Sequence, residues 1–343
     1  MKHIIYLATV AILLLGSCTK QVQTPSVEQY DGYIFFSQDV ETKATMIGSQ
    51  NKIDQFGVVG YKYANSSSWS SHVSTEPSPN VFQSSTMPQV VICDNNGYGT
   101  YSPLQGWSNT MKYSFFAYYP VGNTNVSLVD VTGVPSIKYS VNTSDLRSSM
   151  VDVMVARSLD QEWNSNSTSN GNVALTFEHC LSGLAINIKN STTAPMTIKY
   201  IILEVSGIQY KEITIPLDGG ATEAVEEDIY GYFAIIPNAS DRAIAVGREV
   251  EIADKLILIP QSEDLSIQLE IIYERAASGG FPGSENTIRI PLADSDGNPQ
   301  YLRTSLTKGT KHLILLNFKD STVEAQMGSG AWNDPITVGS TFN

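Results

Sequence analysis

The sequence has little of what most metal sites and catalytic centres require. It contains four histidines and three cysteines in 343 residues. His3 lies in the first apolar segment, and His72, His179 and His312 lie far apart, with no second ligand at His-x₃-His or His-Glu-x-x-His spacing. Neither a Gly-x-Ser-x-Gly elbow nor a phosphate-binding glycine loop occurs. We therefore expect no metal, no cofactor and no catalytic residues.

Positive charge is also scarce. The chain has 21 Lys and Arg residues against 34 Asp and Glu residues, a formal net charge of -13 at pH 7. Nucleic acids and anionic lipid headgroups bind clustered Lys and Arg side chains, and the sequence holds no such cluster. This composition excludes nucleic acid as a partner, and the acidity mainly favours solubility.

Helical periodicity is absent, since no segment repeats apolar residues at helical spacing over any length. Short apolar runs separated by clusters of Gly, Pro, Asn and Ser are typical of β-sandwiches or barrels. Residues 265, 267, 269, 271 and 273 are all apolar or aromatic at a period of two, which predicts a strand with one buried face. We predict an all-β fold with strands at residues 32–37, 56–63, 89–93, 112–119, 152–156, 173–177, 184–188, 197–205, 208–215, 231–236, 255–259, 265–273, 287–290 and 312–318.

The N-terminus has the pattern of a bacterial lipoprotein signal. Lys2 precedes an apolar run at residues 4–15, which is shorter than the roughly 20 residues of a spanning helix. The run ends in Leu-Gly-Ser and then Cys18, which has the form of a lipobox. We predict cleavage before Cys18, lipid on its thiol, and tethering to a membrane outside the cytoplasm. The alternative is an ordinary secretory signal with an accidental cysteine.

The division into domains follows composition. We predict a signal peptide at residues 1–17, a polar tether at 18–30, an N-terminal β-sandwich domain at 31–162 and a C-terminal one at 163–343. The boundary rests on residues 159–172, which are rich in Asn and Ser and nearly free of apolar residues.

Three tryptophans, Trp69, Trp107 and Trp163, lie in polar, loop-like contexts. Exposed tryptophans there would form a platform for glycans, but loop tryptophans that fold back onto a sandwich are the favoured interpretation. Beyond Cys18, the remaining cysteines are Cys93 and Cys180, in apolar strand-like runs. Two cysteines do not make a disulfide framework, so their pairing is left open.

Several sequence blocks, in order along most of the chain, resemble segments of one known protein family. They are residues 33–37 with 41–45, 115–120, 152–156, 175–188 and 256–261. Together with the lipobox, these blocks resemble the fimbrillin-like lipoproteins, the subunits of type V pili of Gram-negative bacteria. The resemblance implies two transthyretin-like sandwiches and a structural, adhesive, polymerising role without enzymatic activity. It also implies a location in fimbriae at the cell surface.

The resemblance further implies an assembly mechanism. In that family, a trypsin-like protease cuts the lipidated precursor after a basic residue and removes the first strand. A terminal strand of the next subunit then fills the groove. Here Lys43 follows the first strand, so a cut between Lys43 and Ala44 would release residues 18–43 with the lipid. The alternatives are a cut at the nearby Lys52, or a Lys43 that is only a surface residue.

The donor strand would be the C-terminal tail. Ile336, Val338, Ser340 and Phe342 alternate with smaller or polar residues and give one mostly apolar face. The backbone of this tail would form hydrogen bonds with the open sheet edge of the next subunit, and its alternating side chains would set the register. The alternative is that this tail forms the last strand of its own domain.

Two other functions compete with a pilus subunit. A surface lipoprotein could bind glycans through sandwich loops, stay lipidated and never polymerise. An enzyme on a sandwich scaffold is a weaker hypothesis, since nucleophile motifs are missing. For a pilus subunit, the expected partners are copies of itself or related subunits, the outer membrane through the lipid on Cys18, and host or bacterial surface ligands. Whether it would be a shaft, anchor or tip subunit is left open.

Overall fold

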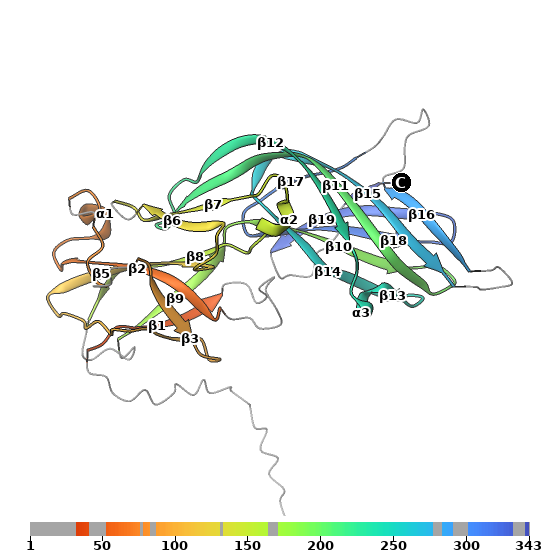
Figure 1. The fold of residues 1–343 in the computed structure, drawn as a ribbon. Coiled ribbons are helices and arrows are strands. Elements are labelled where there is room, and N and C mark those ends of the chain that lie inside the picture. Colours follow the sequence, from red (N-terminus) through yellow and green to blue (C-terminus); the bar gives the residue numbers. More distant parts are fainter. Residues whose placement is uncertain are drawn as a thin grey trace, which may run out of the picture. The chain divides into compact units, whose positions relative to one another are not determined.

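The computed structural model describes residues 32–40, 53–75, 78–82, 87–130, 133–163, 171–276, 283–290, 301–331 and 340–342. Cys18, Lys43, Ala44, Ile336 and Val338 lie outside this part of the chain. Within it, strands make up nearly all regular structure, and the helices are single turns: α1 (Trp69–His72), α2 (Leu146–Ser149) and α3 (Ala239–Arg242). The predicted all-β fold is confirmed (Figure 1).

The first sheet closes on itself. Its order is β1 (Phe35–Val40), β4 (Tyr98–Thr100), β3 (Gln89–Cys93), β2 (Gln55–Ala64), β5 (Met111–Tyr119), β8 (Met154–Glu162) and β9 (Asn172–His179), with β9 returning to β1. Alternate residues of these strands point into one aromatic-rich core that includes Phe56, Phe115 and Phe177. Closure leaves this sheet without a free edge at β1.

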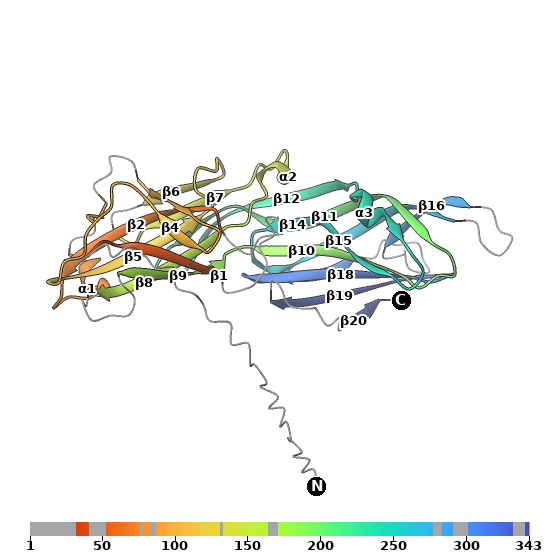
Figure 2. The same cartoon turned by 90° about the horizontal axis from the view of Figure 1, so that it is seen from below.

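The other strands form two sheets packed face to face as a β-sandwich. One sheet has the order β14 (Glu249–Leu258), β10 (Ser182–Asn190), β18 (Thr310–Phe318), β19 (Val323–Ala331) and β20 (Ser340–Phe342). The second has the order β16 (Ser284–Ile290), β15 (Gln261–Arg275), β11 (Met196–Pro216), β7 (Ser136–Ser140) and β6 (Val126–Asp130), with β12 (Glu223–Ile235) and β13 (Ala243–Ile244) on β11, and β17 (Leu302–Leu306) on β15. Figure 2 shows β10, β18, β19 and β20 side by side.

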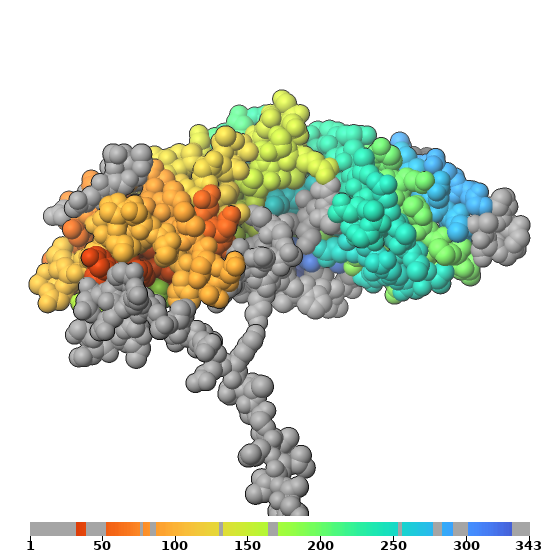
Figure 3. All heavy atoms as spheres, turned by 60° about the horizontal axis from the view of Figure 1, so that its bottom comes forward, coloured from red at the N-terminus to blue at the C-terminus, as the bar shows by residue number. Residues whose placement is uncertain are grey.

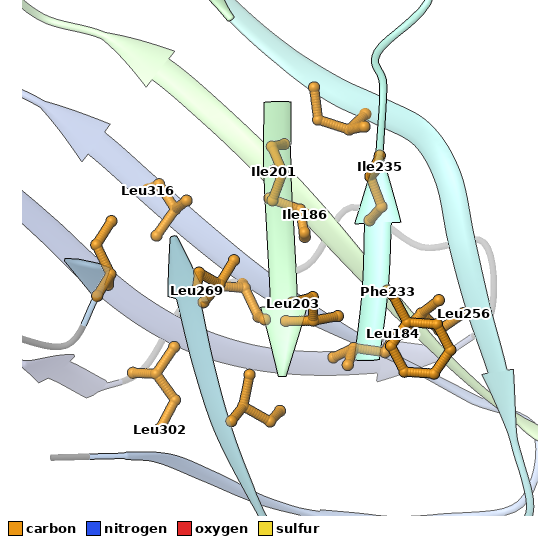
Figure 4. Close-up of a cluster of buried hydrophobic side chains, with 14 of the residues drawn as sticks. Leu184, Ile186, Ile201, Leu203, Phe233, Ile235, Leu256, Leu269, Leu302 and Leu316 are labelled. Atoms are coloured by element: carbon orange, nitrogen blue, oxygen red, sulfur yellow. The ribbon is translucent and has the colours of Figure 1, made fainter. Parts of the chain in front are cut away.

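The core between these two sheets follows the alternation predicted from sequence. On β15, Leu265, Ile267, Leu269 and Ile271 are completely buried. They meet the inward residues of β10, β11, β12 and β18, of which Figure 4 labels Leu184, Ile186, Ile201, Leu203, Phe233, Ile235 and Leu316. Burying one such aliphatic side chain contributes about 1.5–3 kcal/mol, so this interface supplies much of the folding free energy.

Strand β11 differs from the prediction of two separate strands. It runs without a break, and Gly207, at φ +81°, lies at a register shift between the two predicted strands. Its last residues, Glu212–Pro216, pair with β7, and Ile213 packs in a third core with Tyr61 and Phe116 of the first sheet.

The predicted domain boundary does not coincide with a break in sheet pairing. Strand β9 follows the boundary in sequence, yet it pairs with β1 and β8, which precede it. The predicted linker, residues 159–172, contains the end of β8 and the first residue of β9, and residues 164–170 lie outside the described part. The division into two domains stays a prediction.

Candidate functional site

The strand predicted to be removed in assembly is β1, and it is the strand that closes the first sheet. It runs parallel to β9 through six residue pairs, from Phe35↔Asn172 to Val40↔Phe177. On its other side it pairs antiparallel with β4 at Phe36↔Gly99 and Ser37↔Tyr98. Without β1, the facing edges of both β4 and β9 would present unpaired backbone groups.

One side chain of β1, Phe36, and that of the residue before the strand, Ile34, complete the aromatic core. Ile34 and Phe36 have no exposed surface. The Phe36 ring lies within 5.3–6.3 Å, centroid to centroid, of four aromatic rings: Phe56, Phe82, Tyr101 and Phe115. Phe56 and Phe115 meet Phe36 edge to face, and such pairs contribute about 0.5–1.5 kcal/mol beyond area burial. In the space-filling view, the red atoms of residues 32–40 show only as small patches among orange and grey ones (Figure 3).

Hydrogen bonds from loops outside the sheet also hold β1. The backbone N–H groups of Ile34, Phe35 and Gln38 donate to the carbonyls of Gln105, Gly171 and Gly97, at 2.8, 3.1 and 2.9 Å. The Gly97 carbonyl reaches Gln38 because Gly97 adopts φ +84°, a conformation that side chains rarely allow.

Side-chain hydrogen bonds add to this hold on β1. The Tyr101 hydroxyl donates to the Ile34 carbonyl at 3.0 Å, and burial raises the pKa of Tyr101 to about 12, so it stays a donor. The Gln38 side chain accepts from the Ile53 N–H at 3.1 Å and donates to the Ile53 carbonyl.

Gln38 and Ile53 lie on the two sides of the predicted cleavage region. Lys43, Ala44 and Lys52 fall between them, outside the described residues. A cut anywhere in that segment would leave β1 attached to the rest of the protein by noncovalent contacts alone. Those contacts are the pairings with β4 and β9, the Phe36 packing and the loop hydrogen bonds.

The described end of the predicted donor tail lies in its own sheet. Strand β20 pairs antiparallel with β19 at Ala325↔Phe342, Gln326↔Thr341 and Met327↔Ser340. This arrangement agrees with the alternative that the tail is the last strand of its own domain. A donor role for Ile336, Val338 and Phe342 stays a prediction.

The tryptophans considered as a glycan platform pack against the protein. Trp69 is only 5% exposed, and its ring packs against the Phe116 ring with the two centroids 4.6 Å apart. Trp107 Nε1 donates a hydrogen bond to the Gly171 carbonyl at 3.1 Å. The Trp163 ring stacks on the Trp107 ring, with centroids 6.2 Å apart.

The histidines and cysteines serve the core. His72, His179 and His312 are buried, and His179 Nδ1 lies 2.8 Å from Asp152 Oδ1. In the described part of the chain, no three His, Cys, Asp or Glu side chains are placed to hold a metal ion. Cys93 and Cys180 are both free thiols. Burial raises their pKa values to about 11 and about 12, which disfavours the reactive thiolate.

The sequence analysis missed one exposed feature, a group of tyrosines on the outer face of β11 and β12. Tyr230 and Tyr232 alternate with the buried Gly231 and Phe233. The signal was present in the sequence as a period-2 run with large side chains on both faces.

Comparison with known proteins identifies the family. A model of the fimbrillin-like family matches residues 42–332. The chain belongs to the fimbrillin-like family. The matched segment begins after β1 and ends before the predicted donor residues.

A solved structure supports the fold of this fimbrillin-like chain. The chain is similar to a fimbrial protein from Bacteroides vulgatus, at 18% identity and a TM-score of 0.59, over 88% of this chain and 100% of that one. It also resembles a protein from Bacteroides uniformis assigned to cell adhesion, at 15% identity and a TM-score of 0.49, over 89% and 99% of the two chains. No curated protein matches the chain. Among the described helices, none is long and apolar enough to cross a membrane.

Proposed function

We propose that this protein is a structural and adhesive fimbrial subunit of the cell surface. In this account it is exported as a lipoprotein on Cys18 and assembled by proteolytic loss of β1 followed by donor-strand exchange. The observation that carries the proposal is the position of β1, which closes the first sheet between β4 and β9 and fills the core with Phe36. Membership of the fimbrillin-like family supports the same role.

Loss of β1 would create a site that demands a replacement strand. The floor of the groove would be the aromatic rings that now surround Phe36. Their exposure to water would cost free energy in proportion to the apolar area exposed. Its walls would be the β4 and β9 backbones. An incoming strand would satisfy both the hydrogen bonds and the apolar floor.

The predicted donor tail has the spacing that this groove requires. Ile34 and Phe36 enter the core two residues apart, and Ile336 and Val338 share that spacing in the sequence. In the single chain, β20 is held to β19 by three residue pairs. Release of so short a strand would cost little, so the tail would be available to a second subunit.

The test is to block cleavage while leaving the fold intact. A Lys43→Gln/Lys52→Gln variant should reach the cell surface but stay full length and form no polymers, whereas the wild type should form long polymers by electron microscopy. Lys308→Gln, an exposed lysine far from β1 in the sequence, is the matched control and should polymerise normally. Deletion of residues 332–343 should stop polymerisation without stopping cleavage.

Polymers from the uncleaved double variant would contradict assembly by loss of β1. A wild type that stays lipidated and monomeric would instead favour the alternative, a surface glycan-binding lipoprotein.

A further inference from the structure

A group of exposed tyrosines lies on the outer face of the eight-stranded sheet. Tyr230 and Tyr232 of β12 are 57% and 58% exposed, and Tyr301, just before β17, is 40% exposed. Tyr200 of β11 is 44% exposed further along the same face. The opposite face of these strands forms the sandwich core, so core packing does not explain the outer rings.

Strand register places Tyr230 and Tyr232 beside one carboxylate and Tyr301 on the same outer face. Glu204 of β11 lies directly opposite Tyr232, and the Glu204 carboxylate contributes to the raised pKa of the neighbouring Tyr230. Tyr230 and Tyr232 are two residues apart on one face, about 7 Å along the strand. The pair Ile267↔Leu302 places Tyr301 beside Gln268 on the same outer face.

The pKa of Tyr230 depends on other members of this group. The pKa of Tyr230 is raised by partial burial and by Glu204, with smaller contributions from Tyr232 and Tyr301. Tyr301, on a different strand segment from Tyr230, contributes least to this shift.

Planar polar groups border the rings. Glu270 of β15 accepts from Arg289 Nε of β16 at 2.8 Å, and the Arg289 guanidinium is also within electrostatic reach of Glu204. The half-buried Gln268 lies two residues before Glu270 on β15, on the same outer face. The face thus combines stacking surfaces with carboxylate, amide and guanidinium groups, and four strands contribute to it.

This combination matches the chemistry of sugar rings. A pyranose has a face of C–H groups, which is attracted to the negative face of an aromatic ring, and a rim of hydroxyls. Carboxylates accept hydrogen bonds from such hydroxyls, guanidinium groups donate to them, and amides do both. Tyrosine supplies rigid contact area at a low entropic cost.

Charge argues against the other occupants. An anionic ligand would meet Glu204 and Glu270 on a protein of net charge -13. A second copy of this chain on the same face would bring like charges together in its centre. A neutral glycan pays neither cost, and an open sheet face suits an extended chain better than a single sugar.

We infer that the outer face of β11, β12 and β15, with Tyr230 and Tyr232 beside Glu204 and Tyr301 beside Gln268, binds neutral polysaccharide chains. This face contains no residue of β1 or of the C-terminal tail, so it works whether or not strand exchange occurs. It is also distinct from the loop tryptophans.

The test is affinity gel electrophoresis of the full chain through gels that contain a soluble β-1,4-glucan, a xylan, a galactomannan, a β-1,3-glucan or a dextran. We expect retardation by at least one of these probes. Loss of two stacking rings in Tyr230→Ala/Tyr232→Ala should raise the dissociation constant about tenfold or more. Tyr230→Phe/Tyr232→Phe should retain binding to within about threefold, because the rings remain.

Val246→Ala is the matched control, since Val246 is 52% exposed but lies outside the tyrosine face, and its binding should be unchanged. Thermal unfolding of all variants checks that each is folded. Failure of all five polysaccharides to retard the protein would overturn the inference, as would equal retardation of the double alanine variant. A dimer in sedimentation that the same variant disperses would assign the face to a second copy instead.

Discussion

The ring of Phe36 meets the ring of Phe115 edge to face, with centroids 5.3 Å apart and planes at 85°. Phe36 belongs to β1 and Phe115 to β5, which are not neighbours in the first sheet. The contact therefore crosses the interior of the closed sheet, and β1 contributes to the centre of the core as well as to its closure.

We expect this contact to stabilise the unprocessed protein. Phe36→Ala should lower the free energy of unfolding by about 3–5 kcal/mol, because it leaves a cavity among four aromatic rings. Urea unfolding of the whole chain, followed by fluorescence, measures this change. Ser37→Ala, which loses only a hydrogen bond from Asn172, should cost about 1 kcal/mol. Equal effects for the two variants would mean that β1 is not anchored by its buried ring.

The same ring should decide how tightly a separated strand binds. Once β1 has been cut and displaced, a synthetic peptide of residues 31–43 should rebind the groove, with Phe36 as its main anchor. The same peptide carrying Phe36→Ala should bind about a hundredfold more weakly, as about 3 kcal/mol of burial is lost. Fluorescence anisotropy with labelled peptides gives both affinities. Similar affinities would show that backbone pairing alone holds the strand.

Asp152 and His179 form a second buried pair, with Asp152 Oδ1 2.8 Å from His179 Nδ1 and almost no exposure of either side chain. Asp152→Ala should lower the free energy of unfolding by about 3–5 kcal/mol, since it removes one partner of a buried polar pair. The exposed Asp264 is the control, and Asp264→Ala should change stability by less than about 0.5 kcal/mol. Denaturant unfolding at pH 7 distinguishes the two, and a small effect at Asp152 would contradict a structural role for the pair.

His312 gives the protein a pH dependence on the acidic side. Burial lowers the pKa of His312 below its usual 6.5, and its Nε2 accepts from the Thr307 N–H at 3.4 Å. The folded state therefore prefers neutral His312, and this stability is complete above about pH 6.5 and is lost as the pH falls through the lowered pKa. The free energy of unfolding should decline from pH 7 to pH 5, and His312→Gln should decline less steeply. Parallel declines in the two proteins would assign the effect to other groups.

The sequence predicted the strands whose pattern is local. β15 and β10 were expected from their alternating patterns and β5 from its aromatic run, because burial of one or both faces imposes such patterns. The strands β4, β6, β7, β13, β17 and β19 were missed, since they are short or only partly buried and their composition resembles that of loops.

Long-range pairing could not be predicted in the same way. No local pattern states that β1 lies parallel to β9, because the partners are more than a hundred residues apart and their register depends on the whole closed sheet. The tyrosine face was missed for a different reason. A tyrosine on the wet face of a strand and one in the core look alike in a sequence, and only the buried Phe233 between them shows which face is which.

The most direct test of the central claim is the N-terminal sequence and intact mass of the protein recovered from assembled surface fibres. Loss of β1 predicts a chain that begins at Ala44, or shortly beyond it, and carries no lipid. A chain that begins at an acylated Cys18 in every surface fraction would contradict assembly by removal of the strand that closes the first sheet.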